Sequence, residues 1–512
     1  MQKFKRFLFS KKFFIGILAV VQVVLFYMLA VRFYTAGAIV YFMMIMFSLL
    51  TMLYIFERDD LNPAYKIFWM LNMVVFPVTG AIFYVLYGDT KMTPKQKKRM
   101  ERVMERTHRA MVYRAETTEK IIALDKGMGR QAHNLEKRAH APAYENTAVR
   151  YYDMGAAYFR DLLEDMENAQ KSIFLQYFII DEGYMWERIL EILRRKAAQG
   201  VDVRLIYDGW GCLINFPQGY EKTLEKYGIK VNVFNDVKLS AHIGDYLMLN
   251  HRDHRKIAVI DSVIGYSGGI NIADEYINYI ERFGIWKDTG FRLEGEGVWS
   301  LTATFLQTWE LAGGERVRYE DFRPSYRMKT DGIVQPYFDT PLDRLNVCEN
   351  TYLSVINNAK EYVYIATPYL IVDNEMLTAL TIAARSGVDV RIIVPGIPDK
   401  WYVYYVTQSY YKTLLQAGVK IYEYTPGFIH AKMYVTDDVQ AIVGGANTDY
   451  RSMYLNFENC CSFYGGSMPW HVKRDFMDTF MHSRQVTQRD IENTSFLKRL
   501  CQIIFRILGP MM

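Results

Sequence analysis

The chain has 512 residues, enough for two or three domains with substantial cores, so its size does not exclude an enzyme. Its net charge of +5 is small for that length, and its five cysteines form no CxxC pair, which argues against a disulfide scaffold or a zinc site. Apolar residues make up 51% of the chain and aromatic residues 15%, a richness that suits contact with a membrane.

Three uncharged apolar runs occupy the first 90 residues, which we predict to be a transmembrane segment. They cover residues 13–31, 36–56 and 67–87, and each is close to the roughly 20 residues needed to cross a bilayer core. A cleaved signal peptide is the alternative for the first run. That run exceeds the apolar region of about 7 to 15 residues found in signal peptides, and a second run follows at once.

The orientation of these runs is left open by the sequence. Three spans would place the basic N-terminus and the basic cluster at residues 95–109 on opposite sides of the membrane, against the positive-inside rule. Either one run is re-entrant or interfacial, most simply the run with Pro77 and Gly80, or the rule is broken.

We predict a basic helical linker over residues 91–144. Its basic cluster is either a solvated helix face or a site of attraction for anionic lipid, worth about 1 kcal/mol per basic residue.

Beyond residue 145 the pattern changes to short apolar runs alternating with amphipathic stretches, which is typical of an α/β domain. Residues 172–180 and 362–372 read as buried strands. The pentapeptide GVDVR recurs at 200–204 and 387–391, followed by YGIKVNVF at 227–234 and AGVKIYEY at 417–424. Gly200 and Gly387 are placed to end helices before the next strand. The sequence therefore predicts two copies of one unit, over residues 145–330 and 331–512.

Each copy contains a histidine, a lysine two residues later and an aspartate five residues after that. These are His254, Lys256 and Asp261 in HRKIAVID, and His430, Lys432 and Asp437 in HAKMYVTD. Fourteen residues after each histidine, Gly-Gly-x-Asn begins, and it ends at Asn271 or Asn447. The apolar runs between the two motifs predict a hairpin of two strands. On a strand the histidine and lysine would share one face and suit an anion such as phosphate.

A third match, HVKRDFMD at 471–478, lacks Gly-Gly-x-Asn at that offset. Its apolar residues recur at spacings of three and four, which predicts a helix starting near Ser467 and Pro469. Residues two apart on a helix lie about 200° apart around its axis, so His471 and Lys473 would diverge. We therefore expect a surface helix there. His251 is expected to be a hydrogen-bonded loop residue, although it lies three residues before His254.

The paired HxKxxxxD and GGxN motifs resemble the phospholipase D superfamily. PVTGAIFYVLYG at 77–88, NHRDHRKIAVID at 250–261, DYRSMYLNFE at 449–458 and the basic apolar tail resemble bacterial cardiolipin synthases, and the likeness covers nearly the whole chain. It implies a duplicated phospholipase D-like fold, with two mixed-sheet halves flanked by helices. Lys287 departs from the pattern, because related sequences commonly have arginine before the aspartate that Asp288 matches.

By the same resemblance, one histidine attacks phosphorus to give a phosphatidyl-histidine, and the other protonates the leaving group and later deprotonates the acceptor. The family pattern favours His254 as the nucleophile, whereas the symmetry of the sequence allows the reverse. Phosphate contacts are expected from Lys256, Lys432, Asn271 and Asn447, and orientation of the histidines from Asp288 and Glu458. Asp261 and Asp437 each close a strand turn, so a structural role is as reasonable as a chemical one.

The resemblance implies synthesis of cardiolipin from two phosphatidylglycerol molecules at the bacterial cell membrane, without metal, cofactor or nucleic acid. Alternatives are a phospholipase D, a phosphatidyltransferase with another alcohol acceptor, and a catalytically silent scaffold; a nuclease has no need of apolar spans. Oligomeric state and the side of the membrane that holds the site remain open. The C-terminal stretch from Ser495 is predicted to be a basic amphipathic helix, lying either in the lipid interface or on the second half.

Overall fold

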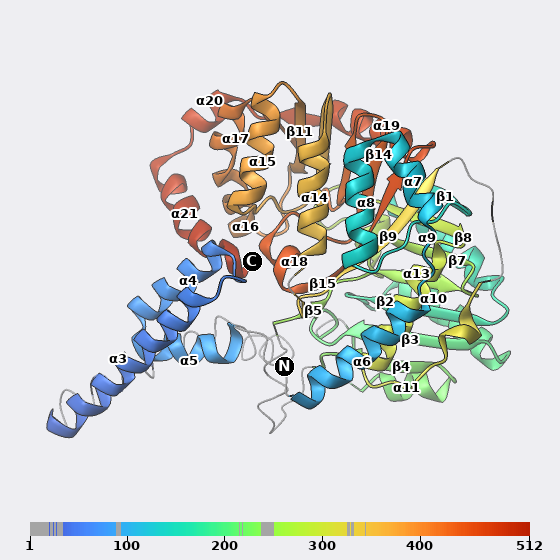
Figure 1. The fold of residues 1–512 in the computed structure, drawn as a ribbon, viewed down its shortest axis with the longest axis horizontal. Coiled ribbons are helices and arrows are strands. Elements are labelled where there is room, and N and C mark those ends of the chain that lie inside the picture. The colour runs from blue at the N-terminus through green and yellow to red at the C-terminus, as the bar shows by residue number, and fades with distance from the viewer. Residues whose placement is uncertain are drawn as a thin grey trace. The chain divides into compact units, whose positions relative to one another are not determined.

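The computed structural model describes residues 34–88, 94–213, 216–217, 219–236, 250–324, 328, 332–343 and 345–512, together with Val20, Val24 and Tyr27. The predicted span over 13–31 lies outside the described residues apart from those three. The chain divides into two compact units (Figure 1). The first holds the described residues up to Gly88, and the second holds nearly all of those from Pro94 onward.

The first unit consists of the helices α3 (Tyr34–Glu57), α4 (Pro63–Val75) and α5 (Pro77–Tyr87). In α3, the 19 residues Ile39–Glu57 are long and apolar enough to cross a membrane, and only 17% of that stretch is buried. It is the one helix of the described chain that meets this test. Asn62 caps α4 by accepting a hydrogen bond from the N–H of Ala64 at 3.0 Å.

The apolar run at 67–87 does not form one continuous helix, and it is the run that the sequence favoured as re-entrant or interfacial. The chain leaves helical geometry at Phe76, where φ is −129° and ψ is 76°, and α5 starts with Pro77. Proline has no N–H to continue the helix, and it disfavours helical geometry in the residue before it. Two short helices result, packed together around Trp69, Phe83 and Tyr84.

The second unit is the duplicated α/β unit. Its strands are β1 (Thr147–Tyr152), β2 (Ser172–Tyr177), β3 (Asp202–Asp208), β4 (Lys230–Phe234), β5 (Arg252–Asp253), β6 (Ile257–Ile260), β7 (Ile264–Gly268), β8 (Gly290–Gly295), β9 (Ile333–Asp339), β10 (Tyr362–Ala366), β11 (Asp389–Pro395), β12 (Lys420–Tyr424), β13 (Met433–Thr436), β14 (Gln440–Gly444), β15 (Asn456–Tyr464) and β16 (Ser483–Gln485). Its α-helices are α6 (Pro94–Ala110), α7 (Ala115–Leu124), α8 (Lys126–Arg138), α9 (Gly155–Glu167), α10 (Tyr184–Ala198), α11 (Glu221–Lys226), α13 (Val298–Leu311), α14 (Val347–Asn358), α15 (Asn374–Arg385), α16 (Trp401–Ser409), α17 (Tyr411–Ala417), α18 (Tyr450–Tyr454), α19 (Met468–Met481), α20 (Gln488–Glu492) and α21 (Phe496–Ile507).

The two sheets repeat one topology, which confirms the duplicated mixed α/β fold. The first has the order β1-β8-β7-β6-β2-β3-β4, and the second contains β9-β15-β14-β13-β10-β11-β12 with β16 and β5 added at edges. In both, the central strand pairs in parallel with the strand from GVDVR and antiparallel with the strand that follows the histidine. Gly200 and Gly387 have φ of 88° and 98°, the left-handed geometry expected after a helix.

The strands are apolar at successive positions because both faces of each sheet are covered. In β2, Ile173 and Leu175 pack in a core with α9 and α10, whereas Phe174 points into a second core. That second core also contains side chains from β13 to β15, α13 and α19, so it joins the two halves. Alternation of side chains along a strand thus supplies two cores from one apolar run.

Residues 94–138 form the helices α6, α7 and α8 and belong to the second unit. The α6 helix packs against α13, with Arg106 paired to Glu310 and the hydroxyl of Thr107 2.8 Å from that of Tyr319. Basic residues of this stretch therefore help to dock helices on the sheet unit.

Candidate active site

The two halves bring their histidines together with each other's acids. The backbone N–H of His254 donates to the carbonyl oxygen of Phe457 at 3.0 Å, and that of His430 donates to the carbonyl oxygen of Lys287 at 2.7 Å. These carbonyls belong to the residues immediately before Glu458 and Asp288. One backbone contact, made twice, therefore places each histidine beside the acid of the other half.

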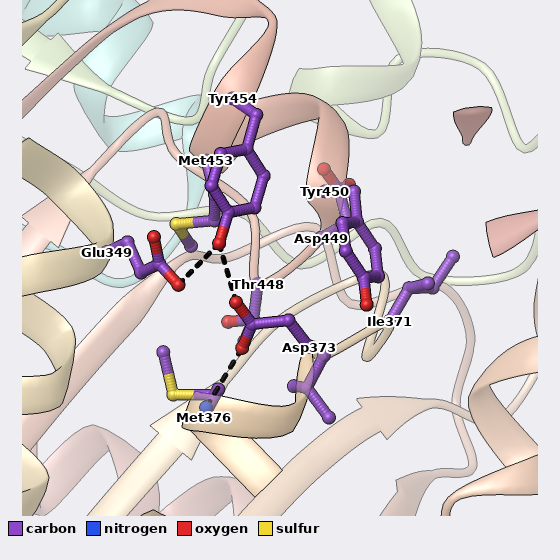
Figure 2. A pocket seen from close by; sticks show the side chains of 10 residues that line it. Glu349, Ile371, Asp373, Met376, Thr448, Asp449, Tyr450, Met453 and Tyr454 are labelled. Atoms are coloured by element: carbon purple, nitrogen blue, oxygen red, sulfur yellow. Dashed lines mark hydrogen bonds between the residues drawn. The ribbon is translucent and has the colours of Figure 1, made fainter. Parts of the chain in front are cut away.

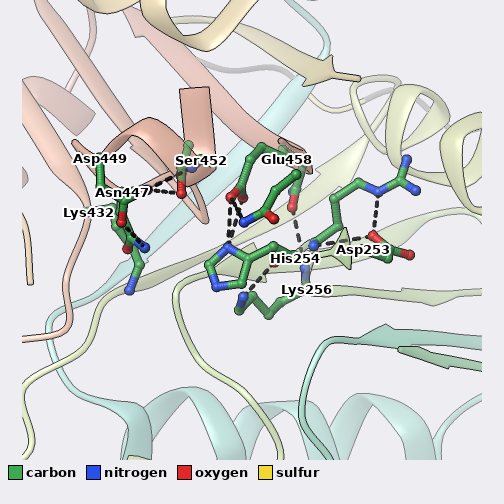
Figure 3. A network of polar contacts seen from close by, with 12 residues as sticks. Asp253, His254, Lys256, Lys432, Asn447, Asp449, Ser452 and Glu458 are labelled. Atoms are coloured by element: carbon green, nitrogen blue, oxygen red, sulfur yellow. Dashed lines mark hydrogen bonds and ion pairs between the residues drawn. The ribbon is translucent and has the colours of Figure 1, made fainter. Parts of the chain in front are cut away.

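The side chains complete the same crossed arrangement, of which Figure 3 shows the pair of His254 and Glu458. Nδ1 of His254 lies 2.8 and 3.0 Å from the two carboxylate oxygens of Glu458, and Nδ1 of His430 lies 2.6 Å from Oδ2 of Asp288. Both acids are fully buried, and the histidines are 8% and 7% exposed. Because the acid accepts the Nδ1 hydrogen, the neutral ring carries its lone pair on Nε2, which leaves that atom to react.

Lys256 and Lys432 lie beside the histidines and are almost fully buried. Each ammonium donates to the backbone carbonyl of the histidine two residues earlier. Burial lowers the pKa of Lys256 to about 8 and that of Lys432 to about 7. An incoming anion would favour the charged form of both, so the pair is suited to receive a phosphate group.

The two histidine–acid pairs differ in their protonation. Burial raises the pKa of Asp288 to about 7, while burial and the charge of Lys432 lower the pKa of His430 well below its ordinary value. Burial also lowers the pKa of His254 to about 4. Burial by itself would raise the pKa of Glu458. The nearby His254 and Lys256 together have the larger, opposite effect and hold the pKa of Glu458 below its ordinary value. Glu458 is thus an anion at neutral pH, whereas Asp288 takes up a proton near pH 7 and His430 is neutral there.

The two asparagines of Gly-Gly-x-Asn are held by neighbouring groups. Asn271 donates from Nδ2 to the hydroxyl of Tyr276 at 2.8 Å, and Asn447 donates from Nδ2 to Asp449 at 3.1 Å. In the described part of the chain, Oδ1 of Asn447 is buried without a hydrogen-bond partner. Each amide keeps a second Nδ2 hydrogen that a substrate oxygen could accept.

Aromatic rings surround the histidines, a feature that the motif search did not find. The rings of Tyr276 and Trp286 lie 5.4 Å from that of His430, and the ring of Phe178 lies 5.1 Å from that of His254. They exclude water from the rings and so account for the low histidine pKa values. The position of Trp286, two residues before Asp288, was the one signal available in the sequence.

Asp261 and Asp437 lie at the other ends of β6 and β13 from the histidines. The carboxylate of Asp261 accepts backbone hydrogen bonds from Gln170, Lys171 and Ser172, at 2.7 to 2.8 Å. Asp437 binds the corresponding N–H groups of residues 360–362 at 2.8 to 3.0 Å. Of the two roles considered, this geometry favours the structural one, in which the aspartate ties the hairpin turn to the start of the central strand.

The other two histidines examined in the sequence lie where expected. His251 is buried, with Nδ1 3.0 Å from the carbonyl oxygen of Leu455. His471 is exposed on α19, which begins after Ser467 as predicted. Lys473 pairs with Asp438 at 2.7 Å.

Asp475, within the third motif match, has an unexpected place in the structure. Its carboxylate pairs with the ammonium of Lys287 at 2.7 Å and accepts a hydrogen bond from the hydroxyl of Tyr151 at 2.5 Å. The Lys287 and Asp475 side chains are 7% and 6% exposed. The lysine that departs from the family pattern therefore joins the strand segment carrying Asp288 to α19.

Beside the Gly-Gly-x-Asn loop of the second half, a small cavity is lined by Glu349, Asp373 and Tyr454 (Figure 2). The Tyr454 hydroxyl lies 2.7 Å from Glu349 and 2.6 Å from Asp373. A hydroxyl has one hydrogen, so one of these carboxyl groups must itself donate. Burial raises the pKa of Glu349 to about 9, which assigns that proton to Glu349. The chain of hydrogen bonds fixes α18, which leads into the strand carrying Glu458.

Comparison with known proteins decides the family. The family model described as cardiolipin synthase, PLD-like domain, matches residues 162–288 and 352–480, one match in each half. The chain is 35% identical over 462 residues to a cardiolipin synthase of Alkalihalophilus pseudofirmus, which covers 89% of this chain and 90% of that protein. The chain belongs to the cardiolipin synthase family.

The chain is also similar to two further proteins. An uncharacterized protein of Streptococcus mutans is 41% identical over 464 residues, covering 89% of this chain and 98% of that protein. The crystal structure of a phosphatidylserine synthase from Haemophilus influenzae superposes with a TM-score of 0.55 at 16% identity, over 75% of this chain and 99% of that one. At that identity the likeness shows the fold alone.

Within the described residues no cluster of three or more His, Cys, Asp or Glu side chains is arranged to hold a metal ion.

Proposed function

We propose that this member of the cardiolipin synthase family is a phosphatidyltransferase that condenses two phosphatidylglycerol molecules into cardiolipin and glycerol through a phosphohistidine. The observation that carries the proposal is the crossed pair of histidines, each oriented by the acid of the other half beside a buried lysine.

In the first step, Nε2 of His254 attacks phosphorus of one phosphatidylglycerol and the bond from phosphorus to the glycerol oxygen breaks. His430 gives a proton to that oxygen, and glycerol leaves. In the second step, His430 takes the proton from a hydroxyl of the second phosphatidylglycerol. The freed oxygen attacks phosphorus, the P–N bond breaks, and cardiolipin is formed. Lys256 and Lys432 would stabilise charge on the phosphate oxygens.

The protonation of the two pairs supports His254 as the nucleophile. A nucleophile must be neutral, which suits His254 beside an anionic Glu458, with its pKa lowered by burial to about 4. A general acid must deliver a proton. In the second pair Asp288, whose pKa burial raises to about 7, holds a proton at neutral pH, and His430, whose own pKa burial lowers, would pass it on through Nδ1 and Nε2.

We also infer a multi-pass anchor in the bacterial cell membrane. Since the run at 67–87 is broken at Phe76, residues 13–31 and 36–56 are the remaining candidate spans. Two spans would put the basic N-terminus and the basic cluster at 95–109 on the same, cytoplasmic side, in accord with the positive-inside rule.

Purified protein supplied with phosphatidylglycerol alone should yield cardiolipin and glycerol in equal amounts, with no metal added. Thin-layer chromatography of the lipid and enzymatic assay of glycerol would measure both. Phosphatidic acid as the main product would indicate a hydrolase of the phospholipase D type. A mixed phosphatidyl product in the presence of another alcohol would indicate a different acceptor.

A further inference from the structure

The α21 helix presents its apolar side to solvent. Phe496, Leu500, Ile503 and Ile507 recur at spacings of four, three and four and so share one face of the helix. Phe496 is 81% exposed and Ile503 is 61% exposed. A helix that packs on a protein core has its apolar side buried, and here the orientation is reversed.

The opposite side of α21 makes the contacts with α16. The Phe505 ring lies 5.3 Å from that of Trp401, Lys498 lies over the ring of Tyr405, and Arg506 lies over that of Tyr410 at 4.2 Å. The partly buried residues Lys498, Cys501 and Phe505 define this inner side. The helix is therefore fixed to the second unit in an orientation that leaves its apolar face open.

Charge and aromatic residues at the edges of this face indicate its partner. Arg499 and Arg506 lie at the edge of this face, whereas Lys498 lies on the inner side, and the helix has no acidic residue. Trp401, which packs against Phe505, is 59% exposed. An apolar face with basic residues at its border, next to an exposed tryptophan, suits the boundary between the headgroups and acyl chains of an anionic bilayer.

We propose that the exposed face of α21 docks on the surface of an anionic phospholipid bilayer, with the exposed Trp401 nearby. The helix would lie in the plane of the membrane and hold the catalytic unit at the surface where its substrate resides. The choice of an anionic lipid rests on the proposed function. The helix α21 belongs to the second unit and α3 to the first, so docking through α21 would act in addition to the N-terminal anchor.

A probe on the helix tests docking without depending on turnover. The full chain would carry three substitutions. His254→Ala prevents turnover and so keeps the lipid composition constant, and Cys501→Ser removes the one cysteine that is not buried. Ile503→Cys then provides the labelling site. An environment-sensitive fluorophore is attached to this cysteine, and vesicles of phosphatidylglycerol and phosphatidylcholine are added. Its emission maximum should shift to shorter wavelength, and bromolipids in the vesicles should quench its fluorescence. The matched control is Ile382→Cys on α15, which is 56% exposed and should stay in water. A water-exposed Ile503→Cys probe in these vesicles would contradict docking. Equal protection in pure phosphatidylcholine or without lipid would indicate another partner, such as a second copy of the chain.

Substitution of the face tests its use in catalysis. In the otherwise native chain, Leu500→Glu with Ile503→Glu should lower turnover of vesicle phosphatidylglycerol at least about tenfold, because two apolar side chains lose their place in lipid. The double variant should turn over a dispersed short-chain phosphatidylglycerol at the unchanged rate. The control Ile382→Glu should alter the turnover of neither the vesicle substrate nor the dispersed substrate. Equal loss with both substrates, or no loss with vesicles, would contradict the proposal. An unsubstituted chain inactive on both substrates would contradict the proposed function, and the probe would then decide docking alone.

Discussion

At the residue scale, His254 and His430 have the same sequence context and different electrostatic surroundings. His254 faces a glutamate with a lowered pKa, and His430 faces an aspartate whose pKa burial raises to about 7. A duplicated motif can therefore supply two distinct functions, a nucleophile and a proton donor, by changing the acid that accepts from Nδ1.

Replacing His254 or His430 by alanine should each reduce cardiolipin formation by about 10³-fold or more, because each removes a reacting group. His471→Ala supplies the matched control, since it changes a histidine of the same letter pattern on an exposed helix and should leave turnover nearly intact. The assignment would be overturned if a folded His471→Ala protein lost its activity.

The pH dependence should reveal the proton held by Asp288 and His430. Burial raises the pKa of Asp288 from 3.8 to about 7, so the pair holds the proton below about pH 7 and loses it above. Above that pH the glycerol oxygen lacks its proton donor, and kcat/KM for phosphatidylglycerol should fall by about tenfold per pH unit.

Two variants separate the groups that titrate in this range. In Asp288→Asn, kcat/KM of the residual activity should no longer decline as the pH rises. Burial lowers the pKa of Lys432 to about 7 as well, so Lys432→Arg, which does not titrate there, should keep the decline caused by Asp288. An unchanged decline in Asp288→Asn would assign the proton to another group.

Residue types and spacing sufficed to predict the histidines, the lysines and the strand hairpins that follow them. The pairing of each histidine with the acid of the other half could not be predicted from residue spacing, because local periodicity does not say which acid contacts which histidine. The aromatic surroundings were missed for the same reason: Phe178 and Tyr276 are ordinary core residues until the fold places them against the rings. Pro77 and Gly80 marked the run at 67–87 as the least regular of the three, although its length and hydropathy alone fit a continuous span.

At the scale of elements, α19 supports the active site from outside it. The buried pair of Lys287 and Asp475 joins this helix to the segment whose carbonyl binds the N–H of His430. Movement of α19 would therefore reach both His430 and Asp288.

Asp475→Ala should lower the free energy of unfolding by about 3–5 kcal/mol, because it leaves the Lys287 ammonium buried without its carboxylate. Thermal unfolding in detergent would measure this, and kcat should fall as well. Asp478→Ala on the same helix is the control: that residue is exposed, and its loss should change stability by no more than about 0.5 kcal/mol. Lys287→Arg should preserve both stability and kcat. A stability of Asp475→Ala equal to that of the control would refute the role given to this pair.

At the scale of the whole molecule, the catalytic site is a product of both halves. Each half supplies one histidine and the acid that orients the other, and a shared core joins the sheets. Neither half contains a complete pair.

Mixing chains that carry His254→Ala with chains that carry His430→Ala should restore no cardiolipin synthesis, since both histidines must come from the same folded chain. Co-reconstitution in one set of vesicles, with each variant alone as reference, would measure this. Recovery of activity in the mixture would mean that halves exchange between chains.

The crossed hydrogen bonds also constrain how this chain can evolve. A duplicated gene segment ordinarily gives redundancy, so that one copy can accumulate changes while the other maintains the activity. Here a lost histidine in one half also leaves the partner acid of the other half without its hydrogen bond. The two copies are therefore expected to remain under joint selection, and neither can serve as a reserve for the other.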